Sequence, residues 1–318
     1  DESYEVYKIM SRYHINKLST TKKEALIAAY EEIQPLYDKH QHPMPRSRYV
    51  DFNQGVDARL FTEEIVELLS RIAIRPLRIA FDDIKTFPSY NKAIRMSAAA
   101  GLKDFSNYLL YNFVDKPLDL YQRLRINVEL CDELNVNIYS FPMKYHPIRK
   151  GKDDAEDLSH NRDYIGKHWN RKYIRAIQAI LNSTKGKVGK GITFFLEAFG
   201  NDETEYMELL EMPETFILYR FFFKWLDEKG SMGTDHWRQC WSHCMNTLAE
   251  DEKQLVLDII HTNTFYKEEL EAVTSADALK LLNFYTNYRK DIITPGTELY
   301  RLKQEYDENP TIQLRRKK

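Results

Sequence analysis

The sequence predicts an α/β fold in its first half and a helical domain in its second half. Four segments with the composition of buried strands begin at residues 49, 77, 105 and 137, so their starts lie 28, 28 and 32 residues apart. This spacing is the length of one βα unit in a parallel barrel or a doubly wound sheet. Beyond about residue 161 no strand-like alternation remains, and apolar residues recur at helical spacing. A repeated βα unit followed by helices is therefore the predicted architecture.

The elements of the first half can be read in chain order. Residues 22–38 carry apolar side chains three and four apart, which predicts an amphipathic helix, and two prolines within residues 40–48 predict a loop. We therefore treat residues 1–48 as an N-terminal helical segment and loop, and residues 49–150 as four βα units. The expected strands are 49–53, 77–81, 105–113 and 137–141, and the expected helices run from Thr62, over 90–100 and from Leu118.

The second half is predicted to be helical and rich in aromatic residues. The run IRKGKDDAEDLSHNRD is highly charged and predicts a linker over 151–160, between the βα units and a helical domain over 161–292. Residues 293–318 are interpreted as a tail. The helical domain is expected to pack on the first half.

Composition excludes several classes of protein. The 318 residues are 43% hydrophobic and carry a formal net charge of −2, so we expect a folded core and no nucleic acid as the main partner. Three cysteines argue against a secreted disulfide framework. No apolar run approaches the roughly 18 residues of a membrane span. We therefore expect a soluble, cytoplasmic protein with no membrane partner.

Polar residues follow each predicted strand, where parallel βα proteins collect their reactive groups. These candidate residues are Asn53, Gln54, Asp57, Arg59, Asp82, Asp83, Asn112, Asp115 and the run 142–146. Two simpler interpretations remain open. Asp82 and Asp83 are also suited to capping the next helix, and Asp57 and Arg59 to forming an internal ion pair.

Four runs in this region resemble a known family. VDFNQGVDARLFTEE, RIAFDD, AGLKDFSNYLLYNFVDKPLDLYQRLRINVEL and IYSFPMKYHPI are similar to the later strands of the radical S-adenosylmethionine (radical SAM) superfamily. Residues 79–83 correspond by position to one family strand end and residues 110–113 to another, and the resemblance covers about a third of the chain, residues 49–150. It implies a partial parallel (β/α) TIM-like barrel with a helical C-terminal domain.

The resemblance also implies cofactors and site residues. It implies S-adenosylmethionine, a [4Fe–4S] cluster, an electron donor protein and a substrate that the sequence does not identify. The cluster reduces S-adenosylmethionine to a 5′-deoxyadenosyl radical, which abstracts hydrogen from the substrate. The positions implied to bind cofactor are Gln54, Asp57, Arg59, Asp82, Asp83 and Asn112. Among them Arg59, Asp82 and Asn112 are expected to meet the methionine and ribose portions.

The family's Cys-x-x-x-Cys-x-x-Cys cluster loop is absent from this chain. Cys131, Cys240 and Cys244 do not have its spacing, so we expect the chain alone to bind no cluster and name no metal ligand. Two explanations are open. Since the chain begins with Asp1, it is expected to be a fragment whose first strands precede it. Alternatively, it is a natural cluster-free relative, a non-catalytic binding or scaffold protein that keeps the half-barrel.

Three further motifs are interpreted as structural. Residues 236–244 place two histidines and two cysteines on one helical face, but the interleaved tryptophans favour a packed helix over a metal site. TKGKVGKGIT has Ile192 where a phosphate loop needs lysine, which favours a helix end and a loop. The patch over 168–172 is suited to closing over the barrel mouth, but we favour a basic helix start held by stacking.

Overall fold

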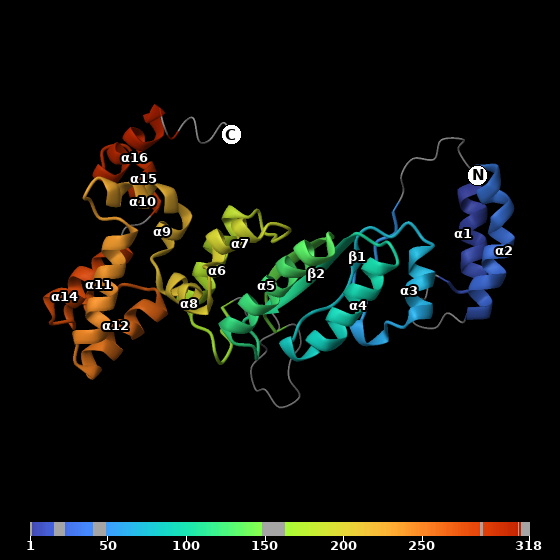
Figure 1. The fold of residues 1–318 in the computed structure, drawn as a ribbon, viewed down its shortest axis with the longest axis horizontal. Coiled ribbons are helices and arrows are strands. Elements are labelled where there is room, and N and C mark those ends of the chain that lie inside the picture. The colour runs from blue at the N-terminus through green and yellow to red at the C-terminus, as the bar shows by residue number, and fades with distance from the viewer. Residues whose placement is uncertain are drawn as a thin grey trace. The chain divides into compact units, whose positions relative to one another are not determined.

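The chain forms two compact units, residues 1–50 and 51–318. The computed structural model describes residues 2–15, 23–40, 49–147, 163–286, 289–310 and 312 (Figure 1). In the first unit, α1 (Glu2–Arg12) packs along α2 (Lys23–Lys39), and Arg12 forms an ion pair with Glu32 at 2.9 Å. The helix predicted over 22–38 is confirmed. The predicted loop lies almost wholly outside the described residues.

A parallel sheet forms the centre of the first part of the second unit. It contains β1 (Leu77–Arg78), β2 (Asp104–Tyr111) and β3 (Asn137–Lys144), in the order β1-β2-β3. All neighbours are parallel, with Leu77 level with Phe105 and Phe105 level with Ile138. The prediction of an α/β fold with a parallel sheet is confirmed.

The first predicted strand lies later in the chain than expected. Instead of a ladder over 49–53, the chain turns at Phe52–Gly55, where the Gly55 N–H donates to the Phe52 carbonyl at 2.8 Å. Gly55 has φ +79°, a conformation that favours glycine in such a turn. The parallel contact comes after the turn, at Val56, which bridges to Ile79. Four parallel chain segments therefore lie side by side in sequence order, the first joined to the chain after β1 at Val56, and at the other edge Val188 bridges antiparallel to Ser140.

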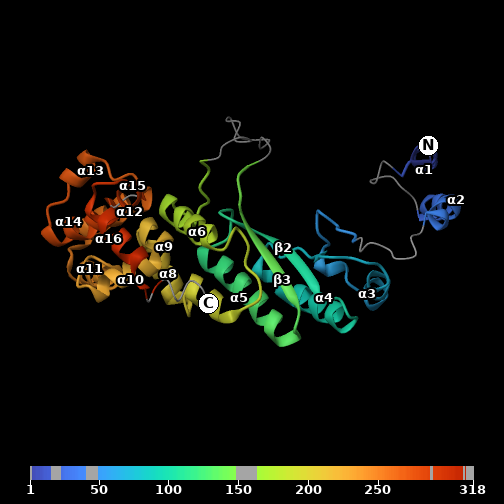
Figure 2. The same ribbon diagram turned by 90° about the horizontal axis from the view of Figure 1, so that it is seen from above.

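Helices connect these segments as predicted. α3 (Glu63–Ser70) is capped by the Thr62 side chain, which accepts from the Ile65 N–H, and α4 (Phe87–Ala99) and α5 (Pro117–Leu134) follow β1 and β2. α4 and α5 lie against the same face of the sheet (Figure 2). The residues buried on that face are mostly apolar or aromatic, among them Phe105, Leu109, Tyr90, Leu120 and Leu124. Its buried polar side chains, Asn107, Asn127 and Ser140, hydrogen-bond with one another or with the Tyr90 hydroxyl.

The remainder of the second unit is helical. Its helices are α6 (Arg171–Ser183), α7 (Ile192–Phe199), α8 (Glu203–Glu211), α9 (Glu214–Leu218), α10 (Arg220–Glu228), α11 (Thr234–Thr247), α12 (Glu250–Thr262), α13 (Lys267–Glu271), α14 (Ala276–Asn283), α15 (Arg289–Ile293) and α16 (Glu298–Glu308). The predicted tail therefore contains a helix. The predicted linker lies in residues 148–162, outside the described residues, and the separation of sheet and helices into two domains stays a prediction.

Aromatic side chains form the core of the helical part. Phe216 stacks on Phe223 with ring centroids 3.8 Å apart, and Trp237 is completely buried. Asn170 caps α6 through its side chain, as the predicted helix start near that residue requires. Searching the described ranges finds no helix with both the length and the apolar composition needed to cross a membrane.

Candidate functional site

One face of the sheet is covered by helices and the other is largely open. The open face carries alternate residues of β2 and β3, of which Tyr108 is 37%, Tyr139 36% and Met143 46% exposed. The Tyr108 ring lies 5.9 Å from that of Phe141. Parallel sheets are normally covered on both faces, because each face is largely apolar. An accessible aromatic face on such a sheet is a candidate binding surface.

Near the start of the strands this face holds a polar group. The Arg78 guanidinium lies over the Tyr108 ring at 4.8 Å and pairs with Asp51 at 3.0 Å. The register places Arg78 level with Ser106. The Arg78 Nε and the Ser106 Oγ are buried and have no hydrogen-bond partner among the described residues. Buried polar atoms are usually paired, so these two atoms are exceptions beneath the start of the open face.

Asp82 lies at the other end of this face, just after β1. Its side chain reaches the surface. Packing around the carboxyl raises its pKa, although the backbone of Leu110 and the charge of Arg123 act in the opposite direction. A carboxyl poised in this way is suited to accepting hydrogen bonds from a hydroxyl or an ammonium group.

Arg123, on α5, ties the carboxyl ends of the strands together from the buried side. Its side chain is completely buried, and burial lowers its pKa despite the acidic neighbours. The guanidinium donates to the carbonyl oxygens of Phe81, Asp82, Leu110 and Asp119 and to the carboxylate of Asp115. It therefore fixes the backbone position of Asp82 without contacting the open face.

Asn112, another predicted site residue, is completely buried at the end of β2. Its amide donates to the carbonyls of Tyr145 at 3.1 Å and Tyr164 at 3.0 Å, and its oxygen accepts from the Gly166 N–H at 2.8 Å. Gly166 lies so close that an added Cβ would be 2.5 Å from the Phe113 carbonyl oxygen. The amide is fully occupied by backbone, and its contact with a cofactor stays a prediction.

The acidic candidates on either side of Asp82 have local structural partners. Asp57 accepts from the Arg59 backbone at 2.9 Å and pairs with its side chain at 2.5 Å, and these hydrogen bonds lower the Asp57 pKa to about 2. Asp83 accepts from the Lys85 N–H as a cap. The capping and ion-pair interpretations are thus confirmed for these residues.

Gln54 lies in the exposed turn before the Val56 bridge, so it precedes the strand it was expected to follow. Gln54 therefore lies apart from the strand ends, and the binding of one cofactor by the six residues stays a prediction. Asp82 lies at the carboxyl end of the open face. The other predicted residues have local roles: Asp57 and Arg59 form an ion pair, Asp83 is a cap, and Asn112 binds backbone carbonyls.

The sequence also contained signals for the residues that were missed. Arg78 interrupts an otherwise apolar strand, LRIAF, and Tyr108 alternates with buried neighbours along β2. Both features indicate a strand with one face that is not packed in a core. Arg123 gave a weaker signal, because a buried arginine looks like any other basic residue on a helix.

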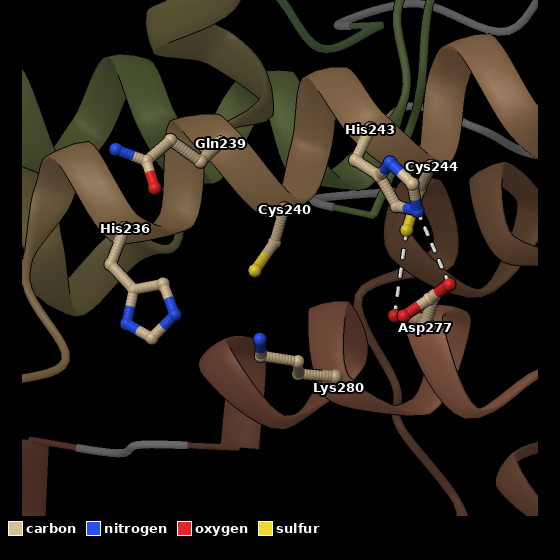
Figure 3. A pocket seen from close by; sticks show the side chains of 7 residues that line it. All are labelled: His236, Gln239, Cys240, His243, Cys244, Asp277 and Lys280. Atoms are coloured by element: carbon tan, nitrogen blue, oxygen red, sulfur yellow. Dashed lines mark hydrogen bonds and ion pairs between the residues drawn. The ribbon is translucent and has the colours of Figure 1, made fainter.

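A cavity of about 310 Å³ lies between α11 and α14, where the sequence placed two histidines and two cysteines on one helical face. Figure 3 shows the Cys240 sulfur directed into this cavity toward the Lys280 amine. His243 Nε2 lies 3.2 Å from the Asp277 carboxylate, and the Cys244 thiol donates to the Asp277 carbonyl. Burial raises the Cys244 pKa to about 11, which keeps this thiol protonated. Over the described ranges, no three histidine, cysteine or acidic side chains are grouped to hold a metal ion.

The third cysteine is far from this cavity in the fold. Cys131 is completely buried on α5, and its sulfur accepts from the Ile138 N–H of β3 at 3.2 Å. It packs as a small apolar side chain between helix and sheet.

Comparison with known proteins gives no assignment. No family model matches the chain, and neither a curated protein nor a solved structure matches it significantly.

Proposed function

We propose that this chain is part of a radical SAM enzyme and that the open face of its sheet is the inner face of a partial TIM-like barrel, where S-adenosylmethionine and a substrate bind. One observation carries the proposal: parallel segments follow one another in sequence order, with helices on one face and an accessible face on the other. This is the arrangement expected of consecutive βα units that curve toward a closed barrel.

The residues of the open face suit S-adenosylmethionine. The cofactor offers an ammonium and ribose hydroxyls to an acceptor such as Asp82, and its adenine offers a flat surface to Tyr108. The Arg78 guanidinium lies over Tyr108 and beside Asp51, further toward the start of the strands, where it would take a polar substrate group. Because Tyr108 lies between these two ends, the cofactor and the substrate would lie along the same face.

The thiols of the chain do not suit the cluster. Cys131 is buried between α5 and β3, and Cys240 and Cys244 lie on α11. The implied activity, reductive cleavage of S-adenosylmethionine to a 5′-deoxyadenosyl radical, therefore needs thiolates from outside this chain. The part assigned to this chain is to bind and orient the cofactor and substrate and to exclude water from them.

Equilibrium dialysis of the full chain with radiolabelled S-adenosylmethionine tests the proposal. We expect saturable binding that Tyr108→Ala weakens about tenfold, since stacking on an aromatic ring contributes roughly 1–3 kcal/mol. Tyr30→Ala is the matched control, because Tyr30 is an exposed aromatic side chain on α2. Absence of saturable binding up to about 1 mM would instead favour the cluster-free binding or scaffold protein.

A further inference from the structure

Two adjoining hollows follow α6 away from the sheet. The smaller, about 200 Å³, begins at Lys144 at the carboxyl end of β3, and the larger, about 600 Å³, lies against α9, α15 and the loop after α12. Arg175 and Gln178 of α6 line both hollows, so the two adjoin along this helix. We call them together the α6 groove. It lies outside the face proposed for S-adenosylmethionine.

The α6 groove is positively charged in a chain with a net charge of −2. Its lining contains Lys144, Arg171, Arg175, Arg289 and Lys290 against the two carboxylates Asp163 and Glu214. Glu214 holds Arg175 in place through two hydrogen bonds of 2.9 and 3.0 Å. Arg289 and Lys290 are exposed at the start of α15. Cations gathered along one hollow favour a ligand with several negative charges.

An aromatic pair lies at the far end of the groove. The rings of Phe265 and Tyr285 are stacked, with centroids 5.5 Å apart and an angle of 22°. Tyr285 is fixed because its hydroxyl donates to the Glu211 carbonyl at 2.8 Å. The Phe265 backbone has φ +54°, which is unfavourable for a bulky residue. Such strain persists only where the surrounding structure enforces it, and it is concentrated at binding sites.

We propose that the α6 groove binds a nucleotide, with its phosphates against Arg175, Arg289 and Lys290 and its base near Phe265. The volume of the larger hollow lies within the range of small-molecule sites, roughly 300–1,000 Å³. The polar side chains of Gln178, Asn182 and Asn263 also line this hollow. Amides both donate and accept hydrogen bonds, as the edge of a base requires. Charge, an aromatic ring and amides in one groove together identify the ligand class.

Isothermal titration calorimetry of the full chain with ADP, inorganic pyrophosphate and hexa-adenylate RNA tests this site. We expect Arg289→Ala/Lys290→Ala to weaken binding of all three at least tenfold. Phe265→Leu should weaken ADP about tenfold and leave pyrophosphate unchanged, because only the base contacts the ring. The matched control is Lys267→Ala/Arg301→Ala, which removes two exposed charges from the same helical part, outside the groove.

Each outcome decides the proposal. Tighter binding of the RNA than of ADP, lost in the same variants, identifies a nucleic-acid strand as the source of the nucleotide. Failure of ADP and RNA to bind, or equal weakening by the control pair, overturns the site. Loss of ADP binding in Tyr108→Ala would place the nucleotide on the sheet face and also overturn it. The proposal does not depend on the radical SAM assignment, because a failure to bind S-adenosylmethionine leaves these measurements unaffected.

Discussion

The sheet part and the helical part of the second unit differ in how many of their polar residues are buried and in what those residues bind. In the sheet part, Arg123 and Asn112 are completely buried and bind backbone atoms at the strand ends. In the helical part, one cation, Lys172, is likewise buried and donates to the Leu210 and Met212 carbonyls, but the core is largely aromatic and the cations of the α6 groove remain exposed along α6 and α15. A polar residue at a strand end is therefore weaker evidence for a site than its position suggests, because the fold also needs polar residues there.

Among the variants that test this comparison, we expect the largest loss of stability from Arg123→Ala. Arg123→Ala should lower the free energy of unfolding by about 3–5 kcal/mol, because it leaves several buried carbonyls and the Asp115 carboxylate without their donor. Chemical denaturation measures this loss. Arg71→Ala, which breaks an exposed pair on α3, is the control and should change stability little. A small loss for Arg123→Ala would show that the strand ends are not held by this residue.

The helical part contains a buried charge of its own, Lys172. Burial lowers its pKa to about 8, although Glu211 and Glu214 act in the opposite direction. Between about pH 8 and 10.5 the folded chain binds fewer protons than the unfolded chain, so this lysine makes stability rise with pH. Relative to Lys172→Met, the parent should gain about 2–3 kcal/mol between about pH 7.5 and pH 10.5. A stability difference that does not change with pH would contradict the shift.

Variants of Asn112 test whether this residue, which the sequence predicts to bind cofactor, stabilises the fold by holding backbone groups. Asn112→Ala should cost about 2–3 kcal/mol of stability, since three backbone partners lose their bonds and alanine tolerates φ +69° poorly. Asn112→Gly removes the backbone strain and should recover part of this loss. Thermal unfolding of both variants measures it. Equal losses in the two variants would show that the backbone conformation contributes nothing.

The smallest expected effect is on S-adenosylmethionine binding, and it distinguishes Asp82 from Arg59, two residues that both follow a predicted strand. Asp82→Asn should weaken S-adenosylmethionine binding about tenfold, because it removes the negative charge at the end of the open face. Arg59→Ala should leave binding unchanged, since Arg59 is an exposed partner of Asp57. Equilibrium dialysis compares the two. A loss confined to Arg59→Ala would move the cofactor to the first strand end.

Much of the fold was readable from periodicity. The spacing of strand starts located β1, β2 and β3, and Thr62 correctly marked the start of α3. The first strand was misplaced because Tyr49–Asn53 has strand composition, whereas the turn after Phe52 depends on Gly55. Local composition does not specify where a neighbouring strand is available to pair.

Less of the candidate site than of the fold could be predicted from the sequence. Strand-end position identified Asp82 but also Asp57, Asp83 and Asn112, whose partners are backbone atoms or a nearby side chain. Whether a carboxylate caps a turn or faces a ligand depends on the direction of one side chain, which periodicity does not give. The α6 groove could not be predicted from the sequence for another reason. Its lining comes from Lys144, α6, α9 and α15, which are far apart in sequence.

The Asn112 side chain joins parts of the chain that are far apart in sequence. One amide binds the carbonyls of both Tyr145 and Tyr164, whose rings also meet edge to face at 5.7 Å, and it accepts from the Gly166 N–H. These contacts cross 33, 52 and 54 positions of the chain. A single side chain at the end of β2 therefore holds the residue that follows β3 and the residues that lead into α6, so its loss would release both at once.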